Sequence, residues 1–143
     1  MKIGLAFTKP QSLAGKAVVW RTYDKYSHSV IVMGDTLYSS QIPRVVKKPV
    51  DGYPIAALYE FDVSEETYRA VEAWLESRVG KWYDVLSLVG WLLGIRSIQW
   101  NRFHFCHEFC HEALVRAGVL EPTNDFITAD NLILSVMTKA NQV

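Results

Sequence analysis

The sequence lacks an excess of charge of either sign, because fifteen lysine and arginine residues balance fifteen aspartate and glutamate residues. A nucleic-acid-binding protein needs a basic surface that neutralises phosphates. The short basic stretch that contains Lys47 and Lys48 is explained as well by the solvated face of a strand. We therefore expect no nucleic-acid partner.

Long apolar runs are absent as well. The longest, from Val85 to Ile95, falls well short of the roughly 20 residues that a membrane-spanning helix needs. The short apolar run at the start of the chain reaches Lys9 and Pro10 without the small-residue cleavage site of a signal peptide. We therefore expect a cytoplasmic protein with no integral membrane segment.

Cysteine is scarce, since the chain contains only Cys106 and Cys110. Without an export signal both are expected to be reduced thiols, and a disulfide within one helical turn is geometrically unfavourable. Three of the four histidines share residues 103–114 with these cysteines, so a metal site has to be considered. Zinc needs four ligands that converge on one point, which four positions on one helix do not readily provide. We expect no metal and no cofactor.

The sequence does contain enough apolar residues for one folded domain, because half of its 143 residues are hydrophobic and 13% are aromatic. Segments of β type dominate the first part of the chain, and segments of helical type dominate the rest. This order predicts an α+β fold in which an antiparallel sheet packs against helices. We expect a single domain over residues 1–143.

Alternation, helical spacing and capping residues predict the individual elements. The predicted strands lie at residues 2–7, 28–33, 36–42, 44–50 and 55–63, and the predicted helices at residues 12–24, 64–80, 83–94, 105–118 and 128–140. A two-residue turn at Gly34 and Asp35 is expected to join the second and third strands into a hairpin. Ser64 and Thr128 are predicted N-caps, and Gly118 follows the end of the cysteine-containing helix.

The position of Cys106 in the first turn of its predicted helix is typical of a nucleophilic thiol. Free backbone N–H groups and the helix dipole lower a thiol's pKa there and can hold a developing oxyanion. Cys106 and Cys110 share the apolar face of the helix, whereas His107 and His111 are predicted to lie on its rim. A second interpretation, in which Cys106 is simply a core residue, explains its apolar surroundings equally well.

A nucleophilic thiol needs a base, usually a histidine that a third polar group orients. His107 is predicted to point away from Cys106, and His104 lies in the loop before it. His28 opens a strand, and a sheet packed on the cysteine helix could bring it near the thiol. A histidine at a strand edge is more often structural, so this local pattern leaves the base open.

Three stretches, residues 26–40, 80–94 and 103–118, together resemble the permuted branch of the NlpC/P60 cysteine-peptidase superfamily. The matching pattern is Ser-His before an apolar strand and a Gly-Asp turn, a Gly-x-x-Tyr-Asp helix start, and Cys-x-Glu-Phe in a helix that ends in Gly. The resemblance extends over residues 1–118. It implies a circularly permuted papain-like fold, in which the catalytic histidine precedes the cysteine, and it is consistent with a phage-encoded protein that acts in a host cell or virion.

The resemblance also implies roles for individual residues. Cys106 matches the nucleophile and His28 matches the general base. The third polar residue of the family would fall on Ser40, where the family more often has His, Glu, Asn or Gln, while a two-residue hairpin turn would pair His28 with Gln41. Both therefore stay candidates. Tyr83 matches a recurrent tyrosine and would line the substrate pocket.

The implied activity is hydrolysis of an amide bond through a Cys106 thioester, with a peptide, isopeptide or cell-wall peptide as substrate. One alternative is a lipid acyltransferase or thioesterase that uses the same Cys–His pair. The other is a non-catalytic phage structural or binding protein with a degraded site. The expected partner is a peptide or acyl-amide substrate, and the sequence leaves its identity and the oligomeric state open.

Overall fold

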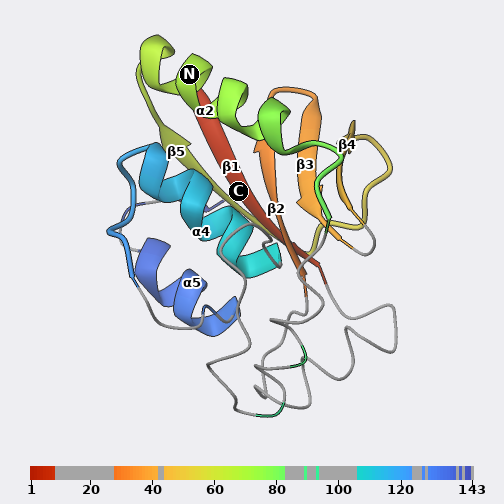
Figure 1. Cartoon of the computed structure of the whole chain (residues 1–143). Helices are drawn as coiled ribbons and strands as arrows, with labels where there is room; N and C mark the ends of the chain where they lie inside the picture. Colours follow the sequence, from red (N-terminus) through yellow and green to blue (C-terminus); the bar gives the residue numbers. More distant parts are fainter. Residues whose placement is uncertain are drawn as a thin grey trace.

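The chain is described here from a computed structural model (Figure 1). The structure describes residues 1–8, 28–41, 44–82, 89, 93, 106–123, 127, 129–137, 139 and 141–142. The helix predicted at residues 12–24, most of the one predicted at 83–94, and the predicted cap Thr128 lie outside the described residues. Tyr83 and His104 lie outside them as well.

The described strands form one antiparallel sheet of six strands, in the order β4-β3-β2-β1-β5-β6. They are β1 (Lys2–Thr8), β2 (His28–Met33), β3 (Thr36–Ser40), β4 (Val45–Pro49), β5 (Ala57–Asp62) and β6 (Asn141–Gln142). The first five were predicted. The two residues of β6 are too few to give an alternation pattern, so sequence analysis missed this strand.

The β2–β3 hairpin is confirmed, with Met33 paired to Thr36 across the two-residue turn. Gly34 takes φ 60° in this turn, a left-handed conformation that costs glycine little because it has no Cβ. The register continues with Val32 opposite Leu37. The turn therefore determines which side chains of β2 and β3 face each other.

Three helices are described: α2 (Glu65–Arg78), α4 (Cys106–Arg116) and α5 (Ala129–Val136). Ser64 caps α2 as predicted, because its side chain accepts a hydrogen bond of 3.1 Å from the backbone N–H of Thr67. The helix α4 begins at Cys106 and is followed by Gly118 at φ 72°. None of the helices in the described part of the chain has both the length and the apolar character needed to cross a membrane.

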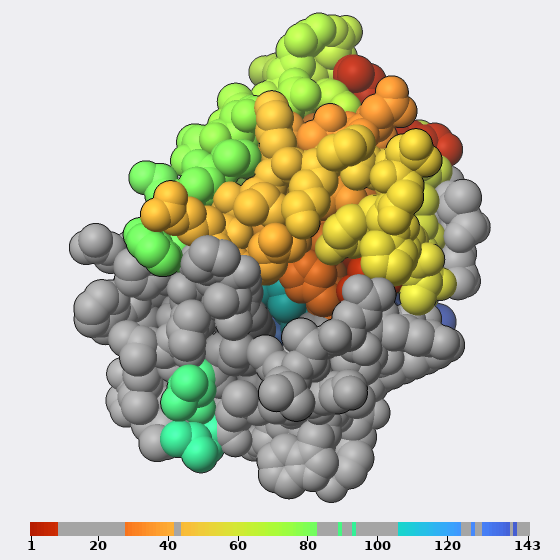
Figure 2. Space-filling view, turned by 90° about the vertical axis from the view of Figure 1, so that its right-hand side faces the viewer, coloured from red at the N-terminus to blue at the C-terminus, as the bar shows by residue number. Residues whose placement is uncertain are grey.

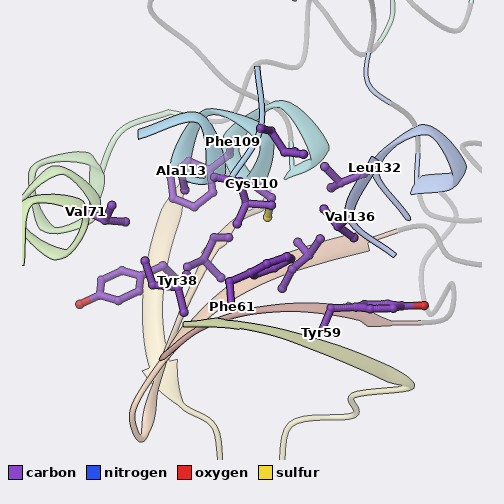
Figure 3. Packing of buried hydrophobic residues seen from close by; sticks show 14 of the residues in the cluster. Tyr38, Tyr59, Phe61, Val71, Phe109, Cys110, Ala113, Leu132 and Val136 are labelled. Carbon is purple, nitrogen blue, oxygen red and sulfur yellow. The ribbon is translucent and has the colours of Figure 1, made fainter. Parts of the chain in front are cut away.

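The main core lies between these helices and one face of the sheet. In β1 and β2 this face is formed by alternate residues, among them Ile3, Leu5 and Ile31. Figure 3 shows Cys110 of α4 and Leu132 of α5 directed toward the sheet from the helical layer. An α+β fold with an antiparallel sheet packed against helices is therefore confirmed.

The opposite face of the sheet carries a second, smaller apolar cluster. Ala6, Val30 and Leu37 are fully buried there. Partly buried residues of the segment between β4 and β5, including Tyr53 and Ile55, pack against them. Both faces of the central strands are therefore covered, which gives β2 two distinct sets of buried side chains.

The helix α5 offers a direct test of this core. Leu132 is 1% exposed and belongs to the main core, whereas Leu134 is 67% exposed. We expect Leu132→Ala to lower the free energy of unfolding by about 2–5 kcal/mol and Leu134→Ala to change it by less than about 0.5 kcal/mol. Urea denaturation followed by circular dichroism measures both. Equal losses in the two variants would contradict the packing of α5 on the sheet.

Candidate active site

The start of α4 is joined to the start of β2 by a buried hydrogen bond. Ser29 Oγ and His107 Nδ1 lie 2.8 Å apart, and the two residues are 0% and 1% exposed. Because Ser29 follows His28 and His107 follows Cys106, the contact holds the first residues of both elements at the same end of the sheet. Figure 2 shows the first turn of α4, in cyan, beside the orange atoms of the β2–β3 hairpin.

The prediction that His107 lies on the rim of the helix is wrong. The first turn of α4 meets the sheet closely enough that His107, about 100° around the helix from Cys106, is also covered. A buried imidazole needs a hydrogen-bond partner, and Ser29 provides one. Burial lowers the pKa of His107 to about 3, and the neighbouring His28 contributes to this shift. His107 is therefore neutral at physiological pH.

The two cysteines are both buried and neither forms a disulfide, but they differ in position. Cys106 is 4% exposed and is the first residue of α4. Cys110 is 0% exposed and packs in the main core beside Phe109 and Ala113 (Figure 3). Burial raises the pKa of the Cys110 thiol, although a hydrogen bond with Ser29 partly offsets this. Cys110 is thus a core residue, as predicted, and the helix start belongs to Cys106.

His28 lies on the other side of β2 from Ser29. It pairs with Thr8 of β1, and alternation along the strand gives it the same face as Val30. Its Nε2 atom lies 2.7 Å from Ser39 Oγ. Burial, with a smaller effect of the charge on Lys48, lowers the pKa of His28 to about 4. His28 is therefore neutral at physiological pH.

The side chain that contacts His28 is Ser39, next to the predicted Ser40. Ser39 in turn lies 3.4 Å from Gln41 Oε1, to which its hydroxyl donates. Gln41 is thus connected to His28 through Ser39, and Ser40 is fully buried on the opposite face of β3. Cross-strand side chains offset by two residues are within reach of one another. The pairing of His28 with Gln41, predicted from the hairpin turn, considered only the residue directly opposite His28.

Tyr53 is a member of this site that sequence analysis did not find. Its phenol lies close enough to Ser39 for the hydroxyl to affect the pKa of the tyrosine. Burial raises the pKa of Tyr53, and the proximity of Cys110 and Cys106 raises it further, while the Ser39 hydroxyl acts in the opposite direction. The residue lies in a turn in which its N–H donates to the Val50 carbonyl over 3.0 Å. The tyrosine falls in the gap between the strands predicted at residues 44–50 and 55–63, and no pattern in the sequence pointed to it.

Two sets of hydrogen-bonded side chains lie at this end of the sheet: His107, next to Cys106, with Ser29 on the helical face of β2, and His28 with Ser39 on the opposite face. Within the described residues, no group of three or more His, Cys, Asp and Glu side chains could hold a metal ion. If the Ser39 hydroxyl donates to Gln41, its oxygen accepts from His28 Nε2–H, and His28 Nδ1 is the nitrogen able to accept a proton. The chemistry available to these residues is proton transfer and nucleophilic attack by sulfur.

Known proteins provide no family assignment. No protein-family model matches the chain, and no curated protein matches it. Any functional assignment therefore depends on the site residues and on the sequence resemblance described above.

The two buried imidazoles predict that the fold loses stability in acid. Histidines of the unfolded chain take up protons near pH 6.5, whereas folded His28 and His107 do so only near pH 4 and 3. Below about pH 6.5 the unfolded state therefore binds more protons, and the free energy of unfolding falls as the pH decreases, while above that value it is unaffected by these groups.

Urea denaturation at pH 7 and pH 5 measures this loss. We expect His107 alone to account for roughly 2 kcal/mol of it, so His107→Gln should reduce the difference between the two pH values by about that amount. Glutamine lacks the titrating proton but keeps a polar group beside Ser29. An unchanged pH dependence in this variant would mean that His107 is not buried in its neutral form.

Proposed function

We propose that this protein is a cysteine hydrolase that cleaves an amide bond through a thioester on Cys106, with His28 as base. The observation that carries the proposal is the contact between Ser29 and His107. It holds the first residue of α4 and the first residue of β2 at one end of the sheet. A helix that begins with a thiol and a strand that begins with histidine, held at the same end of the sheet, support this reaction, which requires the His28 ring to reach the thiol around the end of β2.

In the proposed reaction His28 takes the proton of the Cys106 thiol, and the thiolate attacks the carbonyl carbon of the amide. Backbone N–H groups at the start of α4 stabilise the oxyanion. The amine leaves with the proton held by His28, and a thioester remains on Cys106. A water molecule, deprotonated by His28, then attacks the thioester, so that the acid is released and the free thiol returns.

The neutral state of His28 supports its role as base, because only the neutral ring can accept a proton. A pKa of about 4 is low for a general base that works near pH 7, so the ring needs stabilisation once it is protonated. Ser39 provides an acceptor for the Nε2–H, and Gln41 and Tyr53 extend this network. We assign the orienting role to Ser39, supported by Gln41.

The permuted papain-like fold is part of the same proposal. It is supported by the chain order, with the base on β2 ahead of the nucleophile on α4, and by the packing of this helix on the sheet. The substrate class that follows is a peptide, with amide bonds of cell-wall peptides as the first choice.

Variants of the two cysteines test the proposal. We expect Cys106→Ala to abolish cleavage of cell-wall peptide fragments and His28→Gln to slow it by about 10²–10⁴-fold, as measured by mass spectrometry of the products. Cys110→Ala is the matched control, and it should retain the rate within a few-fold because Cys110 only packs.

Thiol labelling provides a second readout that does not depend on the choice of substrate. Cys106 should react with iodoacetamide faster than a free cysteine at pH 7, and His28→Gln should remove this advantage. If Cys106 reacts no faster than free cysteine and no fragment is cleaved, the protein is a non-catalytic member of its fold class and the proposal fails.

A tyrosine variant tests the network around Ser39. Tyr53→Phe keeps the ring that packs beside Val30 and Leu37 and removes only the hydroxyl. We expect kcat for the peptide substrate to fall about tenfold with little change in KM, because the phenol acts on the base and not on substrate binding. Tyr59→Phe, on the helical side of the sheet, is the control. Equal kcat values in the two variants would remove Tyr53 from the site.

A further inference from the structure

A cavity lies between α4, α5 and residues 120–123. Its volume is about 490 Å³, within the range of small-molecule sites. His111 of α4 contributes to its wall. This residue follows Cys106 by about one and a half turns and lies roughly 140° around the helix from it. The cavity therefore opens on a different flank of α4 from the thiol.

The cavity has an apolar floor, a charged rim, and the uncharged polar side chains of Thr123, Asn131 and Ser135 in its wall. Leu120, Ile127 and Leu132 line it and are 8%, 6% and 1% exposed. Glu121 and Lys139 also line it, and both residues are exposed to solvent. Across the described part of the chain, neither of these two charged side chains takes part in an ion pair. The rim therefore presents one positive and one negative charge above the apolar floor.

A hydrogen bond holds the cationic part of this rim. Lys139 Nζ donates to the Val119 carbonyl over 2.8 Å, which fixes the ammonium group at the cavity wall. Burial lowers the pKa of the His111 ring, and the charge of Glu112 partly offsets this. The neutral ring has one donor and one acceptor nitrogen. The wall thus combines an ammonium group held in place, an exposed carboxylate and a neutral imidazole.

We propose that this cavity binds a small aliphatic zwitterion, an amino acid or a dipeptide. The aliphatic side chain lies over Leu120, Ile127 and Leu132, the ligand's ammonium group faces Glu121, and its carboxylate faces Lys139. A fatty acid would leave Glu121 without a counter-charge, and an alkylamine would leave Lys139 without one. The zwitterion matches all three features at once, and its binding does not depend on the proposed hydrolase activity.

Titration of the full chain with L-leucine and with the dipeptide Gly-Leu, followed by ¹H–¹⁵N NMR, tests the proposal. We expect saturable shifts at Lys139 and Glu121, with a Kd of about 1 mM, which suits an exposed site that binds one small ligand. 4-Methylpentanoate lacks the ammonium group of leucine, and 3-methylbutylamine lacks its carboxylate. Each should bind at least about tenfold more weakly. The tighter of the two zwitterions identifies the amino acid or the dipeptide as the ligand.

Charge variants separate the two ends of the ligand. Glu121→Gln should weaken leucine binding about tenfold but leave the affinity for 4-methylpentanoate unchanged. Lys139→Gln should also weaken leucine binding about tenfold but leave the affinity for 3-methylbutylamine unchanged. Glu65→Gln and Lys81→Gln, both exposed and outside the cavity, are the matched controls. Absence of saturation up to 50-fold above the expected Kd, or equal binding of leucine and its two analogues, would overturn the proposal.

Discussion

The hydrogen bond between Ser29 and His107 connects the sheet to the helical layer at the point where both β2 and α4 begin. Each group would be costly to bury alone, since an unpaired polar side chain in a core loses its bonds to water. The two side chains can be buried together only when α4 lies at the one position along β2 where they meet. The locations of Cys106 and His28 depend on that position. The neutral state of His107 and the packing of the main core depend on it as well. The contact thus fixes the geometry of the site as well as the packing of the fold.

This dependence explains why the fold was easier to predict than the site. The strands β1 to β5 and the helices α2 and α4 each carry a local signal, such as alternation, the Ser64 cap or the glycine after the helix. The start of α4 was predicted to within one residue, at residue 105 instead of Cys106. The side to which His107 points depends on how closely the helix approaches the sheet, which is a tertiary quantity. A helical wheel describes the helix alone, so it assigned this histidine to the rim.

The network around His28 escaped prediction for a related reason. Ser39 reaches the imidazole diagonally across the hairpin, and Tyr53 reaches Ser39 from the segment between β4 and β5. Neither contact follows from the spacing of residues along one strand. The sequence did indicate that the polar partner of His28 would come from β3, because the hairpin turn was clear. The actual partner differs from the predicted pair by one or two residues.

The two-residue turn at Gly34 has a consequence for how this chain can vary. Side chains of β2 alternate between two buried faces. If the pairing register of β2 shifted by one residue, His28 and Ser29 would therefore exchange the faces of the sheet on which they lie. The helix would then meet an imidazole where it now meets a hydroxyl, and both buried clusters would lose their fit. The turn therefore tolerates a change of residue type at Asp35 far better than a change of length. In the evolution of this fold, insertions are expected in other loops, and the length of this turn should stay constant.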